Sequence, residues 1–202
     1  MKKSNGFYGP LISTLKKGQS LSFGLYVKNM GATKDEKDKK DESKYYQNLY
    51  VDRYVLTKTG LALLLSISIG YYDWTKVFVV WVVYTIIESF LDVALKVSEN
   101  QLNNSMSYLR ATINGFLNYF EFVFSFSYLY MYFDALKFTQ SEFQERVPNA
   151  LEYIYFSFVT VSTIGYGDLA VSNDIGRILV MIQATIFLVF VLVFLNHNIA
   201  RI

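Results

Sequence analysis

The stretch TVSTIGYGD (residues 160–168) lies between two long apolar segments and carries two glycines that are separated by one residue. An ordinary strand turns successive carbonyl groups to opposite sides, so a row of carbonyls on one side requires alternating backbone handedness. Gly165 and Gly167 can adopt a positive φ without a Cβ clash, whereas Ile164 and Tyr166 favour ordinary geometry. We therefore predict positive φ at both glycines and a row of backbone oxygens that faces one axis.

This stretch resembles the selectivity filter of tetrameric potassium channels, whose pattern is T-[VI]-G-Y-G-D, and the resemblance extends over roughly residues 111–200. Rings of backbone carbonyls replace the water shell of K⁺ when several chains point them at a common axis. The resemblance implies that K⁺ is the permeant ion, with no other cofactor, and that Asp168 adds negative charge at the outer mouth. The Thr163 hydroxyl is a further expected ligand. The expected K⁺ site comprises Thr163, Ile164, Gly165, Tyr166 and Gly167.

The composition points to a membrane protein with a polar appendage. Of the 202 residues, 52% are hydrophobic and 18% are aromatic. A formal net charge of +2 argues against a nucleic-acid partner, for which a concentrated basic face is expected. The absence of cysteine and the single histidine exclude thiol catalysis, disulfides and a multi-histidine metal site. We expect a passive channel and not an enzyme.

The expected fold is an all-α membrane protein with four transmembrane helices per subunit. Four stretches have the length and apolarity to cross about 30 Å of hydrocarbon. They run over about 54–72, 77–95, 111–133 and 176–195. The expected organisation is a partly flexible cytoplasmic segment (1–52), a two-helix transmembrane hairpin (53–98) and a pore domain (99–202). The charge tract over 34–44 has no apolar period and is interpreted as a solvated linker.

A shorter segment, 149–162, precedes the filter-like stretch and is too short to cross a membrane, so we predict a re-entrant pore helix there. Pro148 precedes it, and Glu152 stands three residues after Asn149, which is a variant of the capping box. A chain with one such loop cannot form a ring by itself, so four copies are expected to assemble as a homotetramer. A filter that faces outward places both termini in the cytoplasm of a cell with the channel in its plasma membrane.

Two aromatic residues of the pore helix occupy the positions where the family carries a pair that braces the filter. The resemblance implies that the Tyr155 hydroxyl bonds Asp168 and that Phe156 packs near Tyr166. The alternative is that both rings fill space among other aromatics.

The last apolar segment contains a stripe that the resemblance places along the pore. An apolar constriction of this kind can close a channel by expelling water. The stripe is equally consistent with ordinary packing or lipid-facing surface. Its members are Leu188, Val191, Leu195 and Ile199.

Acidic side chains within membrane spans are energetically costly, so the acidic residues in the expected spans call for an explanation. Glu88 and Asp92 lie one turn apart, and Glu121 falls at a similar depth to Glu88, with no basic residue expected at that level. Lys58 is expected to extend toward the headgroups from the start of the first span. The carboxyl groups either form interhelical hydrogen bonds or make a proton-sensitive gating element. His197, at the inner end of the last span, is the other pH-sensor candidate or simply a polar helix end.

The sequence therefore predicts a potassium-selective channel. A weakly selective cation channel and a non-conducting regulatory membrane subunit remain alternatives, because the same stretch occurs in less selective relatives and a filter can be vestigial. A subunit of a K⁺ uptake transporter is a third reading, but such pore loops usually keep only one filter glycine, whereas Gly165 and Gly167 are both present.

Overall fold

The computed structural model describes residues 23, 26, 40–69, 73–98, 108–140 and 146–199, and within these ranges the chain is mostly helical. Side chains are described at residues 23 and 26 and over 49–69, 76–92, 112–140 and 146–192. The helices are α3 (Lys40–Ser68), the 3₁₀ helix η2 (Asp73–Phe78), α4 (Val79–Ser98), α5 (Tyr108–Tyr132), α6 (Ala150–Val161) and α7 (Asp174–Ile199), and the strands are β1 (Leu136–Phe138) and β2 (Leu169–Val171).

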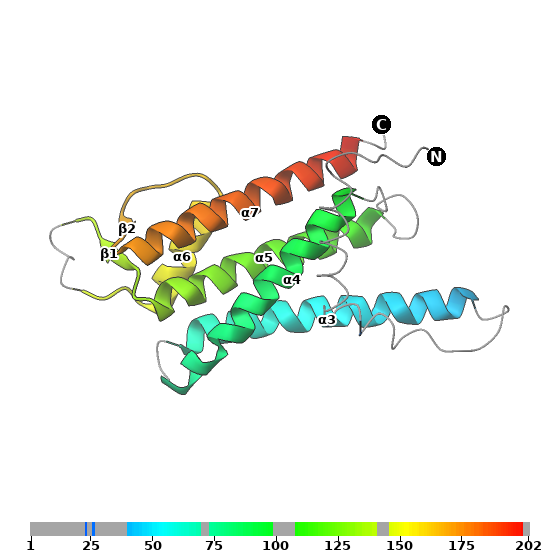
Figure 1. Cartoon of the computed structure of the whole chain (residues 1–202), viewed down its shortest axis with the longest axis horizontal. Coiled ribbons are helices and arrows are strands. Elements are labelled where there is room, and N and C mark those ends of the chain that lie inside the picture. Colours follow the sequence, from blue (N-terminus) through cyan, green and yellow to red (C-terminus); the bar gives the residue numbers. More distant parts are fainter. Residues whose placement is uncertain are drawn as a thin grey trace, which may run out of the picture.

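The long helices form a bundle in which α5 is the central member (Figure 1). Helix α3 packs most extensively along α5, and α4 contacts both α5 and α7. The short helix α6 lies against α5 and α7 at the end of the bundle that also carries β1 and β2 (Figure 1). The filter-like stretch connects α6 to β2, so it lies at this same end.

The core of the bundle is built from side chains of five helices. Tyr130 of α5 meets Phe156 of α6 edge-to-face, with ring centroids 5.1 Å apart, a favourable geometry for two aromatic rings. The fully buried side chains include Val82 of α4 and Tyr153 of α6. Burial of these large rings fixes α6 relative to α5 and α7 and thereby positions the stretch that follows it.

Helix α3 begins earlier than the sequence suggested. It runs without a break through residue 52, where the polar segment was expected to end, and includes the last five residues of the charge tract, from Lys40 to Lys44. The interpretation of these five residues as linker is wrong, because lysine and glutamate are good helix formers and extend a helix that packing has nucleated. The first part of the tract, 34–39, lies outside the described residues.

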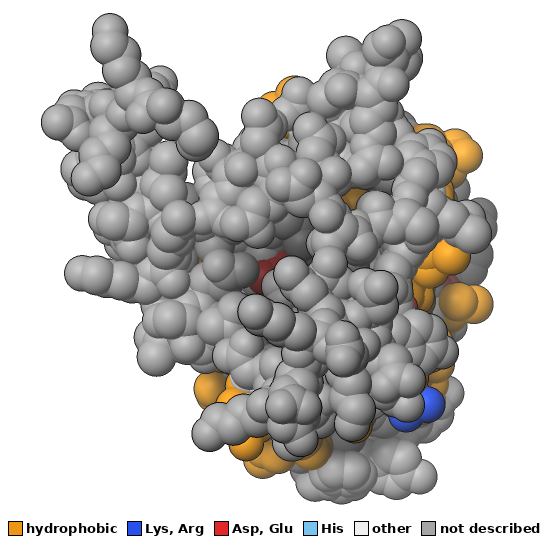
Figure 2. All heavy atoms as spheres, turned by 90° about the vertical axis from the view of Figure 1, so that its right-hand side faces the viewer, with side chains coloured by type: hydrophobic (Ala, Val, Ile, Leu, Met, Phe, Trp, Pro, Cys, Tyr) orange, Lys and Arg blue, Asp and Glu red, His pale blue; other side chains and the backbone are white. Residues whose placement is uncertain are grey.

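Large apolar side chains are exposed on every long helix. Leu64 of α3, Val80 of α4, Phe116 of α5 and Leu188 of α7 are each more than half exposed. In the view from the right-hand end of Figure 1, hydrophobic side chains reach the surface along the sides of the molecule (Figure 2). Large apolar side chains exposed on all four long helices favour a surface that is covered by lipid or by another protein chain.

Among the described residues, one helix has both the length and the apolarity of a membrane span. It is α7 over Asp174–Leu192, with a mean hydropathy of 2.3. Helix α5 is also long but buries Asn114, Asn118 and Glu121, which lower its hydropathy. The prediction of four spans stays a prediction.

Candidate ion-conduction site

Helix α6 begins with the capping box that the sequence predicted. The Asn149 side chain accepts a hydrogen bond from the Glu152 backbone N–H at 3.1 Å, and the Glu152 carboxylate accepts one from the Asn149 N–H at 2.7 Å. Arg146 also pairs with Glu152, and Pro148 is buried just ahead of the cap. The helix runs over Ala150–Val161, which confirms the predicted short helix before the filter-like stretch.

A buried side-chain network fixes α6 between its neighbours. The Ser157 hydroxyl donates to the Val123 carbonyl of α5 at 2.7 Å and accepts from the Gln183 amide of α7 at 2.8 Å. The Tyr130 hydroxyl of α5 donates to the Gln183 side-chain oxygen at 2.7 Å. Gln183 is 1% exposed and therefore links three helices within the core. The sequence interpretation did not single it out, although a lone glutamine in the apolar α7 was the available signal.

The end of α6 leads directly into the filter-like stretch through a Schellman motif. The Ile164 N–H donates to the Val159 carbonyl at 3.2 Å, and the Thr163 N–H donates to the Thr160 carbonyl at 3.1 Å. This pair of bonds requires a left-handed residue after the C-cap, and Thr163 has φ +59°. A β-branched residue rarely adopts this region, so the motif holds Thr163 in a strained conformation.

The backbone then alternates in handedness. Gly165 has φ +59° and Gly167 has φ +79°, and the intervening Ile164 and Tyr166 have negative φ. The predicted positive φ at both glycines is confirmed, and Thr163 extends the alternation by one step that the sequence did not predict. No atom lies within 4 Å of a Cβ built at either glycine, so backbone conformation and not space demands glycine there.

The Tyr155 side chain braces the stretch from the side of α6. Its ring stacks on the Tyr166 ring, with centroids 6.5 Å apart and planes 4° apart. Desolvation and the nearby Asp168 carboxylate raise the pKa of Tyr155 above its ordinary value, and the expected hydrogen bond between these two side chains stays a prediction. The hydroxyl is therefore protonated and available as a donor at neutral pH.

The packing expected of Phe156 near Tyr166 stays a prediction. The Phe156 ring packs edge-on against Tyr130 in the core, and Tyr155 is the residue that stacks on Tyr166. Consecutive side chains on a helix point about 100° apart, so within one chain the two rings contact different neighbours.

Strands β1 and β2 hold the far end of the stretch. They pair antiparallel, with Leu136 opposite Val171 and Phe138 opposite Leu169. The Thr139 N–H donates to the Asp168 carbonyl at 2.9 Å, which extends this pairing to the last residue of the stretch. The sequence did not predict these strands, because three-residue strands carry too little periodicity to detect.

The stripe proposed along the pore is only partly described. Leu188 is 63% exposed and Val191 is half-buried. The side chains of Leu195, His197 and Ile199 lie outside the described residues, although their backbone belongs to α7. The roles suggested for these five residues stay predictions.

The buried acids have a basic partner that the sequence interpretation excluded. Lys58 Nζ lies 3.1 Å from Glu121 Oε2 and 3.9 Å from Glu88 Oε2, and its side chain is 5% exposed. The expectation that Lys58 extends to the headgroups is wrong, because α3 begins at Lys40 and places this residue well inside the helix, on the face toward α4 and α5. Asp92, one turn beyond Glu88, is half-buried.

The comparison with protein families matches the region that contains this site. Residues 117–202 match the family model described as "Ion channel", and the match includes α6, the filter-like stretch and α7 but not α3 or α4. Neither the curated proteins nor the solved structures contain a match to this chain. The chain therefore carries an ion channel domain over residues 117–202.

Proposed function

We propose that this protein is a potassium-selective channel that passes K⁺ passively across a membrane. The single observation that carries the proposal is the alternation of positive φ at Thr163, Gly165 and Gly167 directly after a capped short helix, inside an ion channel domain. Alternation of this kind turns consecutive carbonyls toward one side, where they can replace the hydration shell of K⁺. The ligands would be the carbonyls from Thr163 to Gly167 and the Thr163 hydroxyl.

The ring of ligands would require four copies of the chain around one axis. One chain supplies one row of carbonyls, and in the single chain large apolar side chains beside that row are uncovered. Ile164 is 53% exposed, Tyr166 is 68% exposed and Phe158 of α6 is 41% exposed. A neighbouring subunit would cover these side chains, so their exposure supports a homotetramer.

The helix directions support four membrane crossings per subunit. Helices α3 and α5 both end near the part of the molecule that carries β1 and β2, and α7 starts there (Figure 1). With the filter facing outward, α3 and α5 would lead out of the cell and α4 and α7 would lead back. Both termini would then lie in the cytoplasm, and the α3–α4 hairpin would pack outside the pore against α5.

The test is K⁺ flux through the purified protein in liposomes, together with the reversal potential in mixed K⁺ and Na⁺. The expected result is a current that reverses near the K⁺ equilibrium potential. A reversal near zero would instead indicate a weakly selective cation channel. The matched control is Gly167→Ala, which forces a side chain onto φ +79° and should abolish the flux. Absence of flux from folded, tetrameric wild-type protein would refute the proposal and favour a non-conducting subunit.

A further inference from the structure

A cavity of about 500 Å³ lies between α3 and α4, and we term it the α3–α4 cavity. Four aromatic side chains line it: Tyr54 of α3, Trp81 and Tyr84 of α4, and Phe23 from the segment that precedes α3. Leu61 also lines it, and Leu61 and Tyr84 are each 39% exposed, so the cavity opens onto the surface of the hairpin. Ligand sites typically have this size, apolar and aromatic walls and a few oriented polar groups.

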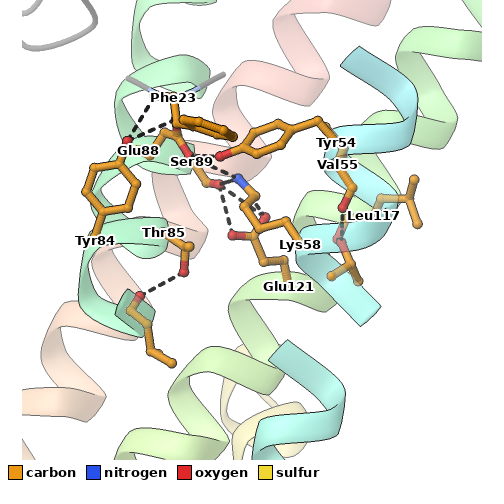
Figure 3. A network of polar contacts seen from close by, with 12 residues as sticks. Phe23, Tyr54, Val55, Lys58, Tyr84, Thr85, Glu88, Ser89, Leu117 and Glu121 are labelled. Carbon is orange, nitrogen blue, oxygen red and sulfur yellow. Dashed lines mark hydrogen bonds and ion pairs between the residues drawn. The ribbon is translucent and has the colours of Figure 1, made fainter. Parts of the chain in front are cut away.

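Phe23 contacts both helices of the hairpin at this cavity (Figure 3). Its ring lies 5.7 Å from the Tyr54 ring of α3, with the two planes tilted by 53°. Its backbone N–H donates a hydrogen bond to the Tyr84 hydroxyl of α4 at 2.9 Å. The ring and the backbone of one residue therefore recognise two different helices.

The backbone hydrogen bond distinguishes Phe23 from a purely apolar occupant of the cavity. The Tyr84 hydroxyl accepts from Phe23 while it donates to Glu88 Oε1 at 3.4 Å. A lipid acyl chain carries no donor and could not make the bond to Tyr84. A backbone N–H that leaves water, in turn, needs an acceptor. The pairing therefore favours a peptide segment over an acyl chain at this place.

The aromatic walls are held in place by bonds to the interior of the bundle (Figure 3). The Tyr54 hydroxyl donates to Glu88 Oε2 at 2.5 Å, and Glu88 also accepts from Tyr84. Lys58 Nζ lies 3.9 Å from Glu88 Oε2, 3.1 Å from Glu121 Oε2 of α5 and 5.4 Å from the centre of the Tyr54 ring. These contacts orient both tyrosine rings in advance, which lowers the entropic cost of binding a ligand between them.

A second aromatic side chain lies beside the first. Phe23 and Tyr26 are both helical and three residues apart, so they share one helix face. Their ring centroids are 5.8 Å apart. Phe23 nevertheless stays 52% exposed and Tyr26 59% exposed, so the contact with the hairpin buries little area and can open and close.

We propose that the α3–α4 cavity is a docking site for the N-terminal segment of the same chain, with Phe23 as the anchor. The group that the site recognises is an aromatic ring next to a backbone N–H. The sequence around the anchor, LSFGLYV (residues 21–27), is apolar and suits a surface that faces lipid. In the proposed channel, docking places this segment against the side chains that join the hairpin to α5 of the ion channel domain.

The test replaces Phe23 by a phenylalanine derivative with a photoreactive diazirine group, in the full chain reconstituted into phosphatidylcholine vesicles. Illumination attaches the probe to the molecule that lies beside residue 23, and mass spectrometry locates the adduct. We expect adducts within residues 54–61 of α3 or 81–84 of α4 of the same chain. The control places the same probe at Leu64, which is 64% exposed on α3 and should form adducts with lipid.

Variants of the cavity wall test which groups recognise Phe23. Tyr84→Phe keeps the ring but removes the acceptor, so the ratio of protein adducts to lipid adducts should fall about 2- to 10-fold, as expected for one lost hydrogen bond. Tyr54→Ala removes the ring beside Phe23 and should shift the adducts to lipid, whereas Tyr54→Phe keeps the ring and should retain the protein adducts. Should Tyr54→Ala fail to fold, Tyr84→Phe still decides.

Three results would overturn the inference. Adducts from residue 23 that are mainly with lipid would make the cavity a lipid site. Adducts with a neighbouring copy, seen as a cross-linked dimer on a denaturing gel, would assign the contact to the assembly and not to the single chain. An unchanged adduct ratio in Tyr84→Phe would show that the backbone hydrogen bond does not hold the segment. Because cross-linking does not depend on ion conduction, failure of K⁺ flux would refute the proposed channel function and leave this result untouched.

Discussion

Replacement of Gln183 by leucine tests whether the buried network holds α6 in place. Leucine has a similar volume but offers no hydrogen bond, so the variant leaves the Tyr130 hydroxyl without its acceptor at 2.7 Å and Ser157 without its amide donor at 2.8 Å. An orphaned buried hydroxyl costs about 1–3 kcal/mol, and the lost bonds contribute about 0.5–1.5 kcal/mol each. We expect the free energy of unfolding to fall by about 2–4 kcal/mol.

The assay is denaturant unfolding of the protein in detergent micelles, combined with a double-mutant cycle. Tyr130→Phe removes the hydroxyl that Gln183→Leu leaves unpaired, so the double variant should recover about 1–3 kcal/mol relative to Gln183→Leu alone. Because Ser157 lies in α6, the single variant should also reduce K⁺ flux more than the double variant does. A double variant no more stable than Gln183→Leu would refute the reasoning, since the orphaned hydroxyl would then not be the source of the loss.

Substitutions at four further positions test individual features of the structure. Asn149→Ala removes the cap of α6 and should cost about 0.5–2 kcal/mol in the same unfolding assay, whereas Asn149→Asp retains an acceptor and should cost much less. Gly176→Ala places a Cβ 3.1 Å from the Ala135 Cβ and carbonyl oxygen and should destabilise the protein by about 1–3 kcal/mol. Gly60→Ala, where no atom lies within 4 Å, should instead stabilise α3 by about 0.5–1 kcal/mol; equal effects at the two positions would contradict the packing argument. Gly167→Ala should lower the free energy of unfolding by about 1–2 kcal/mol per chain, because alanine disfavours the positive φ at this position, and it should eliminate K⁺ flux. Normal flux in this variant would show that a left-handed backbone is not needed there.

The features that were predictable from sequence are those that a few neighbouring residues decide. The capping box depends on Asn149 and Glu152, and the positive φ of Gly165 and Gly167 depends on the absence of a Cβ. Both are local properties of backbone geometry. The α-helical class likewise followed from long apolar segments.

The features that were missed depend on contacts between distant segments. Lys58 was misplaced because the face that α3 turns inward is set by its packing along α5 and by side-chain contacts to α4, whereas its own sequence has only a weak amphipathic pattern. The positive φ of Thr163 could not be predicted from the sequence, because threonine normally avoids the left-handed region. It depends on the two hydrogen bonds that end α6. The contact of Phe156 with Tyr130 could not be predicted, because Tyr130 belongs to another helix.

The close approach at Gly176 determines how α7 can move. Gly176 packs closely against Ala135 and Val171, in the segments that hold the far end of the filter-like stretch, so the first turn of α7 could serve as a pivot. Leu192 lies roughly 24 Å farther along the axis at the usual rise per residue. A tilt of about 10° about this pivot would displace Leu192 by about 4 Å and leave the end of the bundle that carries β1 and β2 almost unmoved. In the proposed channel, the part of α7 beyond this pivot could thus move while the filter-like stretch keeps its spacing.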